Sequence, residues 1–482
     1  MSQQELELPQ GWIKTNVNDI CEKSQYGWTT SSEKNGNLKL LRTTDITSGQ
    51  IDWNLVPFCK DEPKDIEKYL LEDGDVVISR AGSIGFSCLI KKPKKSVFAS
   101  YLIRFRPLID TQFFVYFLKS PFYWKQVSEK SNGIALVNIN ATKLNQITLS
   151  LPPLNEQKRI ASKIEELFSR IDSTKQSLEH AKLQLEQYRQ SLLKSAFEGK
   201  LTEEWRKQNN PSLDILFEKI QSNRKSQESK LQKLEPFNDD EPFSIPENWS
   251  WTRVGILSNQ IQYGTGEKAS TKESILPVLR MGNIQDGVLN FKKLKYYPDN
   301  WKSREQYILK DGDVLFNRTN SAELVGKSAI YRNFHPPAVF AGYLIRVKIL
   351  DEIYFPYLLT LYLNSIFGKS YVKSVVTQQV GQANVNGTKL AMMPIPLMSN
   401  EEQEQIVSQI EQGFSLIENT TQIVESSLQN LQTMKTSVLK QAFEGKLVPQ
   451  DPNDEPASVL LEKIKSTKEN QSTKQRGMKN VK

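Results

Sequence analysis

The spacing of apolar residues changes character about 150 residues into the chain. Up to that point, short apolar runs are separated by glycine and aspartate, as in GDVVISRAGSIGFSCLI at Gly74–Ile90, which is typical of strands. A helical stretch at Phe113–Trp124 is mixed in. This mixture predicts an α+β domain over residues 1–152.

After Pro152 and Pro153 the pattern becomes helical. Apolar residues occupy the a and d positions of about five heptads, at Ile160, Ile164, Leu167, Ile171, Leu178, Leu185, Tyr188 and Leu192. Most other positions are Lys, Glu, Gln or Ser, so the apolar seam is narrow. Because a narrow seam suits a partner helix better than a broad core, we favour a coiled-coil helix over an amphipathic helix packed on its own domain.

The same two-part pattern occurs twice. SLLKSAFEGKL at Ser191–Leu201 returns as SVLKQAFEGKL at Ser437–Leu447, and the helical seam returns at Ile406, Ile410, Ile417, Val424, Leu431, Met434 and Val438. Six further blocks recur in the same order about 240 residues apart: LPQGW/IPENW, LRTTDI/LRMGNI, LEDGDVVISR/LKDGDVLFNR, FASYLIR/FAGYLIR, NINATKL/NVNGTKL and LFEKIQS/LLEKIKS. A conserved order over this many blocks indicates two copies of one module.

The repeat divides the chain into segments. We expect α+β domains at 1–152 and 245–397, helical regions at 153–222 and 398–466, a polar linker at 223–244, and a basic, disordered tail at 467–482. Two similar helices in one chain can pair about an internal two-fold axis. If they pair antiparallel, about 40 residues form a rod of about 60 Å with one domain at each end. Gly199 and Gly445 are expected to cap the helix C-termini.

Composition narrows the function classes. The formal net charge of +8 has the sign that a nucleic-acid binder needs, although it is weak evidence alone. Cys21, Cys59 and Cys88 show no CxxC spacing and predict buried free thiols in a reducing cytoplasm. The most apolar stretch, Ile353–Phe367, is too short to span a bilayer, and the N-terminus lacks a secretion signal. We therefore expect a cytoplasmic location.

The sequence contains no recognisable catalytic pattern. His180 and His335 are isolated, so they form neither a triad nor a metal site. The LPPL and HPPA stretches lack the polar first residue of an amino-methyltransferase tetrad, and no P-loop is present. The Glu-x-Lys triplets beginning at Glu198 and Glu444 lack a paired aspartate. A standalone methyltransferase or nuclease is thus disfavoured, and we expect no cofactor or metal.

Basic and polar side chains gather in the loops where the two copies differ most. Arg and Lys can neutralise phosphates, and Arg, Asn and Thr can read base edges. The DNA-binding candidates are Arg42, Thr43, Thr44, Arg80, Ser83, Lys91, Lys92, Arg104, Arg280, Asn283, Lys292, Lys293, Arg318, Thr319, Asn320 and Arg346. Three arginine pairs recur at matching positions, which fits either DNA contacts or shared structural ion pairs: Arg42/Arg280, Arg80/Arg318 and Arg104/Arg346. We expect Tyr101/Tyr343 and Trp12/Trp249 in the cores.

This layout resembles the specificity subunit of type I restriction–modification systems. The resemblance rests on the blocks that bracket each helix, LPPLNEQKRI with SLLKSAFEGKL and IPLMSNEEQEQI with SVLKQAFEGKL, and on the DGDVVISR and DGDVLFNR blocks. It covers about residues 8–466.

The resemblance implies two α+β target-recognition domains, each reading one half-site of a split double-stranded DNA target. Their long helices would pair as an intramolecular antiparallel coiled coil. It also implies a non-catalytic subunit that recruits two methylation subunits, which bind S-adenosylmethionine, and that can assemble with two restriction subunits. Candidates for docking the methylation subunits are Glu165, Lys175, Glu179, Glu411, Thr421 and Glu425. The alternative is a structural or regulatory protein whose coiled coil dimerises between chains.

Overall fold

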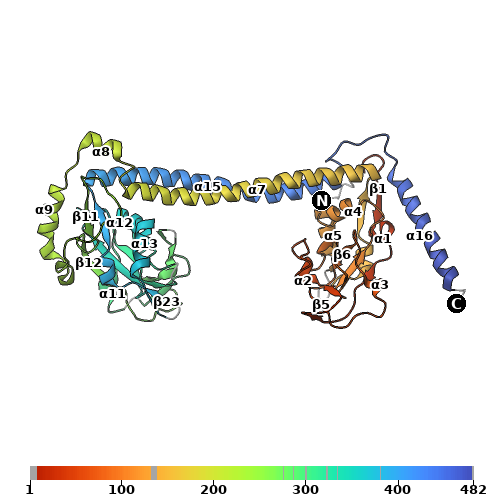
Figure 1. Ribbon diagram of the computed structural model, residues 1–482, viewed down its shortest axis with the longest axis horizontal. Coiled ribbons are helices and arrows are strands. Elements are labelled where there is room, and N and C mark those ends of the chain that lie inside the picture. The colour runs from red at the N-terminus through yellow and green to blue at the C-terminus, as the bar shows by residue number, and fades with distance from the viewer. Residues whose placement is uncertain are drawn as a thin grey trace. The chain divides into compact units, whose positions relative to one another are not determined.

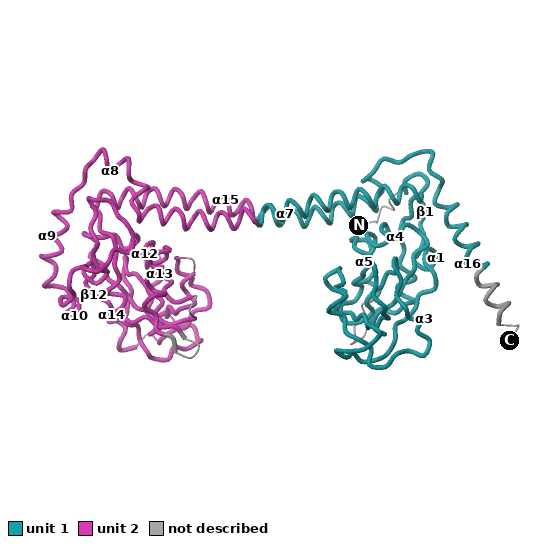
Figure 2. The backbone as a smooth tube through the Cα atoms, viewed as in Figure 1, with its two compact units in different colours: residues 1–179, 425–482 teal, residues 180–424 magenta. Residues whose placement is uncertain are grey.

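The computed structural model describes residues 8–131, 138–274, 276–285, 287–298, 301–321, 324–333, 335–379 and 382–479. The chain forms two compact units, residues 1–179 with 425–482 (unit 1) and residues 180–424 (unit 2) (Figure 2). Each unit holds one α+β domain and parts of two long helices, α7 (Leu154–Phe197) and α15 (Asn400–Phe443). The predicted repeat therefore appears as two units of like construction.

The domain of unit 1 is built on two four-stranded sheets (Figure 1). The first has the order β2-β9-β6-β7, formed by Gln25–Tyr26, Leu102–Phe105, Val76–Ser79 and Ser87–Leu89. The second has the order β3-β5-β4-β8, formed by Ser32–Glu33, Phe58–Cys59, Lys39–Leu41 and Ser96–Phe98. Strands β1 (Ile13–Asn16) and β10 (Thr148–Leu151) pair antiparallel. The short helices are α1 (Val17–Ile20), α2 (Thr43–Ile46), α3 (Ile66–Tyr69), α4 (Thr111–Phe117), α5 (Pro121–Ser131) and α6 (Ala141–Asn145).

The domain of unit 2 repeats this framework. Its main sheet has the order β12-β21-β17-β19, formed by Ser258–Tyr263, Leu344–Ile349, Val314–Asn317 and Ser328–Ile330. The other strands are β11 (Ser250–Arg253), β13 (Leu276–Leu279), β14 (Ile284–Gln285), β15 (Val288–Leu289), β16 (Lys295–Tyr297), β18 (Thr319–Asn320), β20 (Val339–Phe340), β22 (Thr377–Gln379), β23 (Gln382–Asn384) and β24 (Pro394–Leu397). The helices are η2 (Met281–Asn283), α11 (Arg304–Tyr307), α12 (Pro356–Asn364), α13 (Ile366–Val375) and α14 (Gly387–Ala391).

The long helices pair antiparallel within each unit. In unit 1, Lys435 Nζ of α15 lies 2.5 Å from Asp172 Oδ1 of α7. In unit 2, the Arg189 guanidinium of α7 lies 4.0 Å from the ring centroid of Phe414 on α15. These contacts confirm the predicted fold class. Of the predicted seam residues, Tyr188 and Met434, which occupy equivalent positions, are about half exposed.

The repeated AFEGK block docks each helix end onto a domain. Phe443 at the end of α15 packs against Phe113 and Phe117, with ring centroids 5.1 and 5.6 Å apart. Phe197 at the end of α7 packs edge-on against Tyr362 at 5.0 Å. Each helix end is thus buried in a domain other than the one that precedes that helix in the chain.

Two glycines end these helices, as predicted. Gly199 and Gly445 have φ values of 72° and 70°, a left-handed conformation that favours glycine at a helix C-terminus. A side chain at Gly199 would meet Cγ of Pro246 at 2.4 Å, and one at Gly445 would meet Cγ of Pro9 at the same distance. The copied prolines and glycines therefore fit one another in each unit.

Segments outside the repeat core also have structure. The region predicted to be a linker contains η1 (Arg224–Ser226) and α10 (Ser229–Gln232), after α8 (Glu203–Asn209) and α9 (Asp214–Asn223). Helix α16 (Ala457–Lys479) includes most of the tail predicted to be disordered, and residues 480–482 lie outside the described part. The helix includes the repeated LLEKIKS block, in which Leu461 and Ile464 are buried in the core of unit 1, and continues through the charged tail.

Candidate nucleic-acid interface

One pair of recurring arginines belongs to the domain framework. Arg104 and Arg346 are buried, 9% and 3% exposed, and lie 3.8 and 3.4 Å from the equivalent carboxylates of Asp75 and Asp313. Each also donates to a main-chain carbonyl, Arg104 to Leu70 O and Arg346 to Ile308 O. Burial lowers the pKa of both guanidinium groups. Burial beside a carboxylate leaves little of either side chain exposed to DNA and favours the structural alternative for this pair.

A second pair sits at a short helical turn. Arg42 N donates to Asp45 Oδ2 at 2.8 Å, and its guanidinium binds Asp45 Oδ1 at 2.8 Å. Arg280 N donates to Asn283 Oδ1 at 2.9 Å. The amide cannot neutralise a guanidinium, so the Arg280 side chain donates to Lys293 O at 3.2 Å instead. The same backbone turn therefore presents a neutralised arginine in unit 1 and an unneutralised one in unit 2.

The third pair lies at the end of each main sheet. Arg80 N donates to Tyr101 O at 2.9 Å, and Arg318 N donates to Tyr343 O at 3.0 Å. The guanidinium carbon of Arg80 lies 5.2 Å from the ring centroid of Tyr26, and that of Arg318 lies 4.9 Å from the ring centroid of Tyr263. Neither arginine has a carboxylate within 4 Å among the described residues, in contrast to Arg104 and Arg346.

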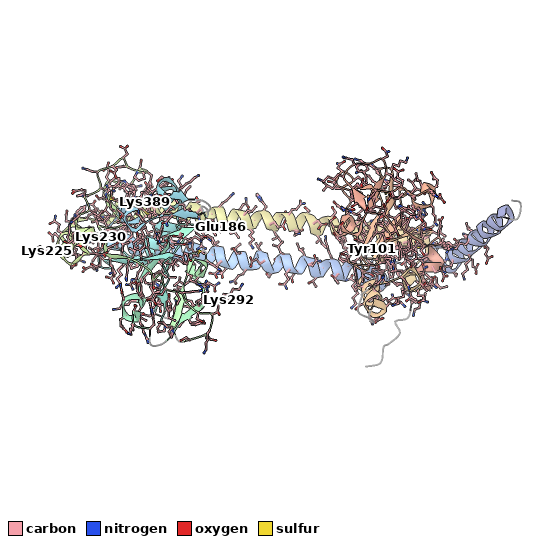
Figure 3. All side chains as sticks on the ribbon, turned by 90° about the horizontal axis from the view of Figure 1, so that it is seen from below. Tyr101, Glu186, Lys225, Lys230, Lys292 and Lys389 are labelled. Atoms are coloured by element: carbon pink, nitrogen blue, oxygen red, sulfur yellow. The ribbon has the colours of Figure 1, made fainter. Side chains whose placement is uncertain are left out.

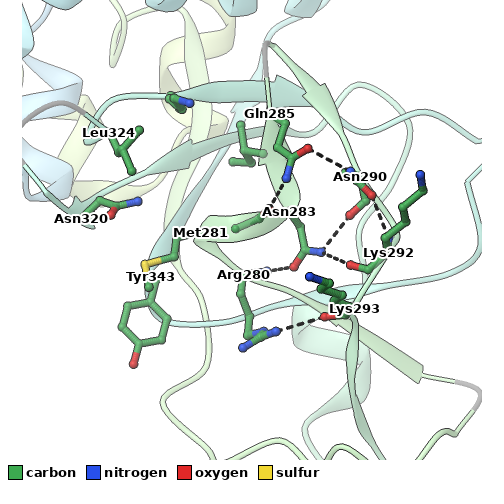
Figure 4. A pocket seen from close by; sticks show the side chains of 13 residues that line it. Arg280, Met281, Asn283, Gln285, Asn290, Lys292, Lys293, Asn320, Leu324 and Tyr343 are labelled. Carbon is green, nitrogen blue, oxygen red and sulfur yellow. Dashed lines mark hydrogen bonds between the residues drawn. The ribbon is translucent and has the colours of Figure 1, made fainter. Parts of the chain in front are cut away.

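A cavity of about 730 Å³ opens beside the turn of unit 2 (Figure 4). It brings together five predicted DNA-binding residues: Arg280, Asn283, Lys292, Lys293 and Asn320. Asn283 is buried and donates to Asn290 O and Lys292 O at 2.8 and 3.3 Å, so it holds the loop and is not free to read a base. Lysine cations and amide groups surround the cavity, with Met281, Leu324 and Tyr343 as its apolar part.

The remaining candidates are placed by loops. Lys91 and Lys92 in unit 1 and Lys292 and Lys293 in unit 2 are exposed, and Lys292 is labelled in Figure 3. The two lysine pairs occupy different loops of the framework, one between β7 and β8 and the other between β15 and β16. Thr44 is exposed, Thr43, Ser83 and Asn320 are half-buried, and Thr319 is buried in β18. Thr319 is thus part of the framework.

Four tyrosines were missed or misplaced by sequence reasoning. Tyr101 and Tyr343, expected in the cores, are 59% and 46% exposed, whereas Trp12 and Trp249 are buried as predicted. Tyr26 and Tyr263 are 38% and 42% exposed. A repeated QYG triplet at Gln25–Gly27 and Gln262–Gly264 could have revealed the second pair, because each glycine passes close to a carbonyl oxygen of the neighbouring strand.

Comparison with known proteins now identifies the architecture. Residues 9–183 and 255–426 match the family described as the type I restriction modification DNA specificity domain. The chain belongs to this family. The two matched segments cover most of the chain and correspond to the two copies of the module.

Similar proteins extend over nearly the whole length. The EcoKI specificity subunit of Escherichia coli (strain K12) is 28% identical over 480 residues, covering 95% of this chain and 96% of that protein. The StySPI specificity subunit of Salmonella potsdam is 26% identical, covering 95% and 96%. Among solved structures, the HsdS subunit from Thermoanaerobacter tengcongensis has a TM-score of 0.56 at 18% identity, covering 92% of this chain and all of that one. A chain from a type I R-M system structure on complex assembly has a TM-score of 0.64 at 17% identity, covering 91% and 99%; both likenesses concern the fold.

Family membership confirms the main functional predictions. The chain is a type I restriction–modification specificity subunit, which recognises DNA sequence and is not itself the enzyme of the complex. Within the described residues, no helix is long and apolar enough to cross a membrane. Cys21, Cys59 and Cys88 are buried and free, as predicted, and burial raises the pKa of Cys59 to about 11.

Proposed function

We propose that the domain of unit 1 reads one half-site of a bipartite double-stranded DNA target and the domain of unit 2 reads the other. The observation that carries this proposal is the duplicated framework with dissimilar loops. The same sheets and the same Arg–Asp ion pairs support an Asp45-neutralised turn in unit 1 and an open, basic cavity in unit 2. A common scaffold with two different polar surfaces suits two different half-sites.

The proposed DNA contacts are the candidates that are accessible and not enclosed in the framework. In unit 1 these are Arg42, Thr43, Thr44, Arg80, Ser83, Lys91 and Lys92. In unit 2 they are Arg280, Lys292, Lys293, Arg318 and Asn320. Lysines on the loops suit phosphates, while the hydroxyl and amide groups near the turns suit base edges.

The complex would contain two methylation subunits, which bind S-adenosylmethionine, and can also contain two restriction subunits, in the cytoplasm. The presence of two similar units supports two equivalent docking sites. The exposed docking candidates in unit 1 are Glu165, Lys175, Glu179 and Glu425. In unit 2, Glu411 is exposed and Thr421 is half-buried. Exposed side chains outside the buried apolar seam can contact a methylation subunit.

The alternative function, a coiled coil that dimerises between chains, is less well supported. Within each unit, α7 and α15 of the same chain contact each other, and the seam residues Ile171 in unit 1 and Ile417 in unit 2 are buried. A dimer in solution whose dissociation unfolds the long helices would favour that alternative.

The test is to compare the chain alone with the chain bound to its methylation subunits. We expect weak binding to DNA by the chain alone, because a net charge of +8 gives little non-specific attraction, and tight, sequence-specific binding by the complex. Mapping methylated adenines in cells that carry both subunits should reveal one split motif. Equal affinity with and without the methylation subunits at fixed salt, or a methylation pattern independent of this chain, contradicts the proposal.

A further inference from the structure

We propose that Arg80 with Tyr101, and Arg318 with Tyr343, form two equivalent grips on the sugar–phosphate backbone of DNA that carry no sequence information. This inference rests on the proposed function and deepens it by dividing each recognition domain into a common grip and a variable reader.

The strand register places each arginine and tyrosine on one face. Ser79 pairs with Leu102 in the β6–β9 ladder, so Arg80 and Tyr101 are the next opposed residues. In unit 2, Asn317 pairs with Leu344, and Arg318 and Tyr343 follow in the same way. Directly opposed residues of an antiparallel pair project from the same face of the sheet. The Arg80–Tyr101 and Arg318–Tyr343 backbone hydrogen bonds keep this register beyond the strand ends.

A second tyrosine contacts each arginine from across the sheet, from strand β2 beyond β9 in unit 1 and from β12 beyond β21 in unit 2. Tyr26 pairs with Ile103, and Tyr263 pairs with Ile345, which puts both rings on the same face as the arginines. Each ring is fixed at its far end, since Tyr26 Oη accepts from Ala141 N at 2.9 Å and Tyr263 Oη accepts from Gly387 N at 2.6 Å. A ring that is held in place and lies under a guanidinium limits the arginine's motion, which lowers the entropy lost on binding.

The arginine of each grip has a hydrogen-bond donor that could still bind an anion. Arg80 and Arg318 are half-buried, and in each the Nε atom is buried without a hydrogen-bond partner in the described structure. Arg318 is oriented further by Gly342 O and Asn384 Oδ1, both neutral acceptors. A partly desolvated cation without a carboxylate is better satisfied by an incoming phosphate than by its present surroundings. Tyr101 and Tyr343 add an exposed ring and hydroxyl beside it.

Identity between the two copies argues for the backbone and against the bases. The arginine and both tyrosines are the same in the two units and share the backbone hydrogen bond and the ring contact, whereas the loops that follow the arginine differ, as AGSIG and TNSAELVG. Residues that are alike in two domains cannot tell two half-sites apart. The phosphates and sugars are the part of DNA that every half-site shares.

The experiment uses the complex of this chain with its methylation subunits. DNA affinity is measured over a range of salt concentrations on two duplexes, one carrying the mapped target and one with both half-sites scrambled. The variants are Arg80→Gln, Arg318→Gln and the double variant. Lys230→Gln serves as the matched control, because it removes one exposed positive charge in the region before the second domain (Figure 3).

We expect each arginine variant to weaken binding about tenfold, by the same factor on both duplexes, and to reduce the slope of log affinity against log salt by about one. Lys230→Gln should change neither quantity, and the methylated motif should stay the same in every variant. A loss confined to the target duplex, a changed base in the motif, or an unchanged salt slope overturns the grip.

Tyrosine variants keep the test independent of folding. Arg80→Gln loses its stacking on Tyr26, whereas Tyr101→Ala and Tyr343→Ala alter exposed side chains and should leave the thermal midpoint unchanged. We expect each to weaken both duplexes equally by about fivefold, and the corresponding Phe variants to separate the hydroxyl from the ring. Unchanged affinity in both alanine variants overturns the role of the tyrosines. If the wild-type complex does not prefer the target duplex, both the proposed function and the grip are wrong. If the wild-type complex prefers the target but the arginine and tyrosine variants bind DNA as tightly as wild type, only the grip is wrong.

Discussion

The indole nitrogen of Trp249 donates a hydrogen bond of 2.8 Å to Oε2 of Glu402. Two repeated blocks meet at this contact, the tryptophan of IPENW and the glutamate in the first turn of α15. The segment after the first AFEGKL, which is not repeated, adds Thr202 and Arg206, and both bind the Glu402 carboxylate. In unit 1, Trp12 donates to the equivalent Glu156 at 3.0 Å. Glu156 has no arginine partner there, and its Oε1 is buried without a partner in the described structure.

This difference predicts opposite responses to the same substitution. Glu402→Gln leaves the largely buried Arg206 without its carboxylate and should lower the free energy of unfolding by about 3 kcal/mol at pH 7. Glu156→Gln removes a buried charge that has no cationic partner in direct contact, so it should cost less than about 1 kcal/mol or stabilise the protein. Denaturant unfolding of the two variants and wild type measures both changes. Equal losses in the two variants would contradict this account.

The same site predicts a pH dependence. Burial raises the pKa of the Glu156 carboxyl, so the folded state holds this proton more tightly than the unfolded state does. Its contribution to stability is therefore present below the unfolded pKa and is lost as the pH rises through the folded pKa. Wild-type protein should gain stability from this group as the pH falls below the raised, folded pKa toward the unfolded one, and Glu156→Gln should lose that part of the pH dependence. A pH profile that is identical in wild type and Glu156→Gln speaks against a raised pKa.

The buried arginines give a prediction about specificity. Arg346→Gln breaks the ion pair with Asp313 inside a sheet and should destabilise the protein by about 3 kcal/mol. Arg104→Gln should cost less, because Asp75 keeps Arg106, whose Nε lies 2.8 Å from Asp75 Oδ1. Any folded protein that remains should methylate the same motif as wild type, because neither guanidinium reaches the DNA. The measurement is thermal unfolding together with methylation mapping below the midpoint. A changed methylation motif in either variant would indicate that the substituted arginine does contact DNA.

Exchange of domains tests whether the domain of unit 1 and the domain of unit 2 recognise their half-sites independently. Replacing residues 1–150 with the first domain of another family member should change one half-site and leave the other as it was, because the DNA-facing loops of unit 2 are untouched. Methylation mapping reads both half-sites at once. The matched exchange of the second domain should alter only the other half, and a simultaneous change of both halves refutes the modular account.

Helix length should set the spacer between the half-sites. Four helix-forming residues inserted after Ser177 in α7, with four after Asn430 in α15, add about 6 Å of rise and about one turn. The heptad seam then contains only a stutter, which coiled coils absorb by local unwinding. DNA rises about 3.4 Å per base pair, so the preferred spacer should lengthen by one to two base pairs.

Methylation of targets that differ only in spacer length gives the readout for this insertion. Four residues inserted after Ser466 in α16 serve as the control, because they lengthen a helix that is not part of the seam. If the insertions in α7 and α15 leave the original spacer preferred, helix length does not determine it.

Sequence reasoning succeeded where the signal was periodic or repeated. The heptads and the copied blocks predicted the paired helices, the α+β domains and the glycines at the helix C-termini. These features depend on local sequence, so the same residues give the same structure in both copies. It could not separate Arg104 from Arg80, since both belong to copied blocks and only the tertiary structure decides which one lies beside an aspartate. It assigned Tyr101 to the core because aromatic residues are usually buried. The repeated LLEKIKS block placed the start of α16 in a helical region, but the charged residues beyond it carried no pattern that predicted the helix to continue through the tail.

The division of the chain between the units has a consequence for synthesis on the ribosome. Unit 2 is one continuous segment, residues 180–424, whereas unit 1 combines residues 1–179 with 425–482. The core of unit 1 needs Leu439, Phe443 and Leu461, which are translated after all of unit 2. The first domain therefore emerges early but has to wait, with its apolar docking surface uncovered, until the second has been made. Chaperone binding to nascent chains, and loss of the protein to proteases after premature termination, should concentrate on the part that is synthesised first.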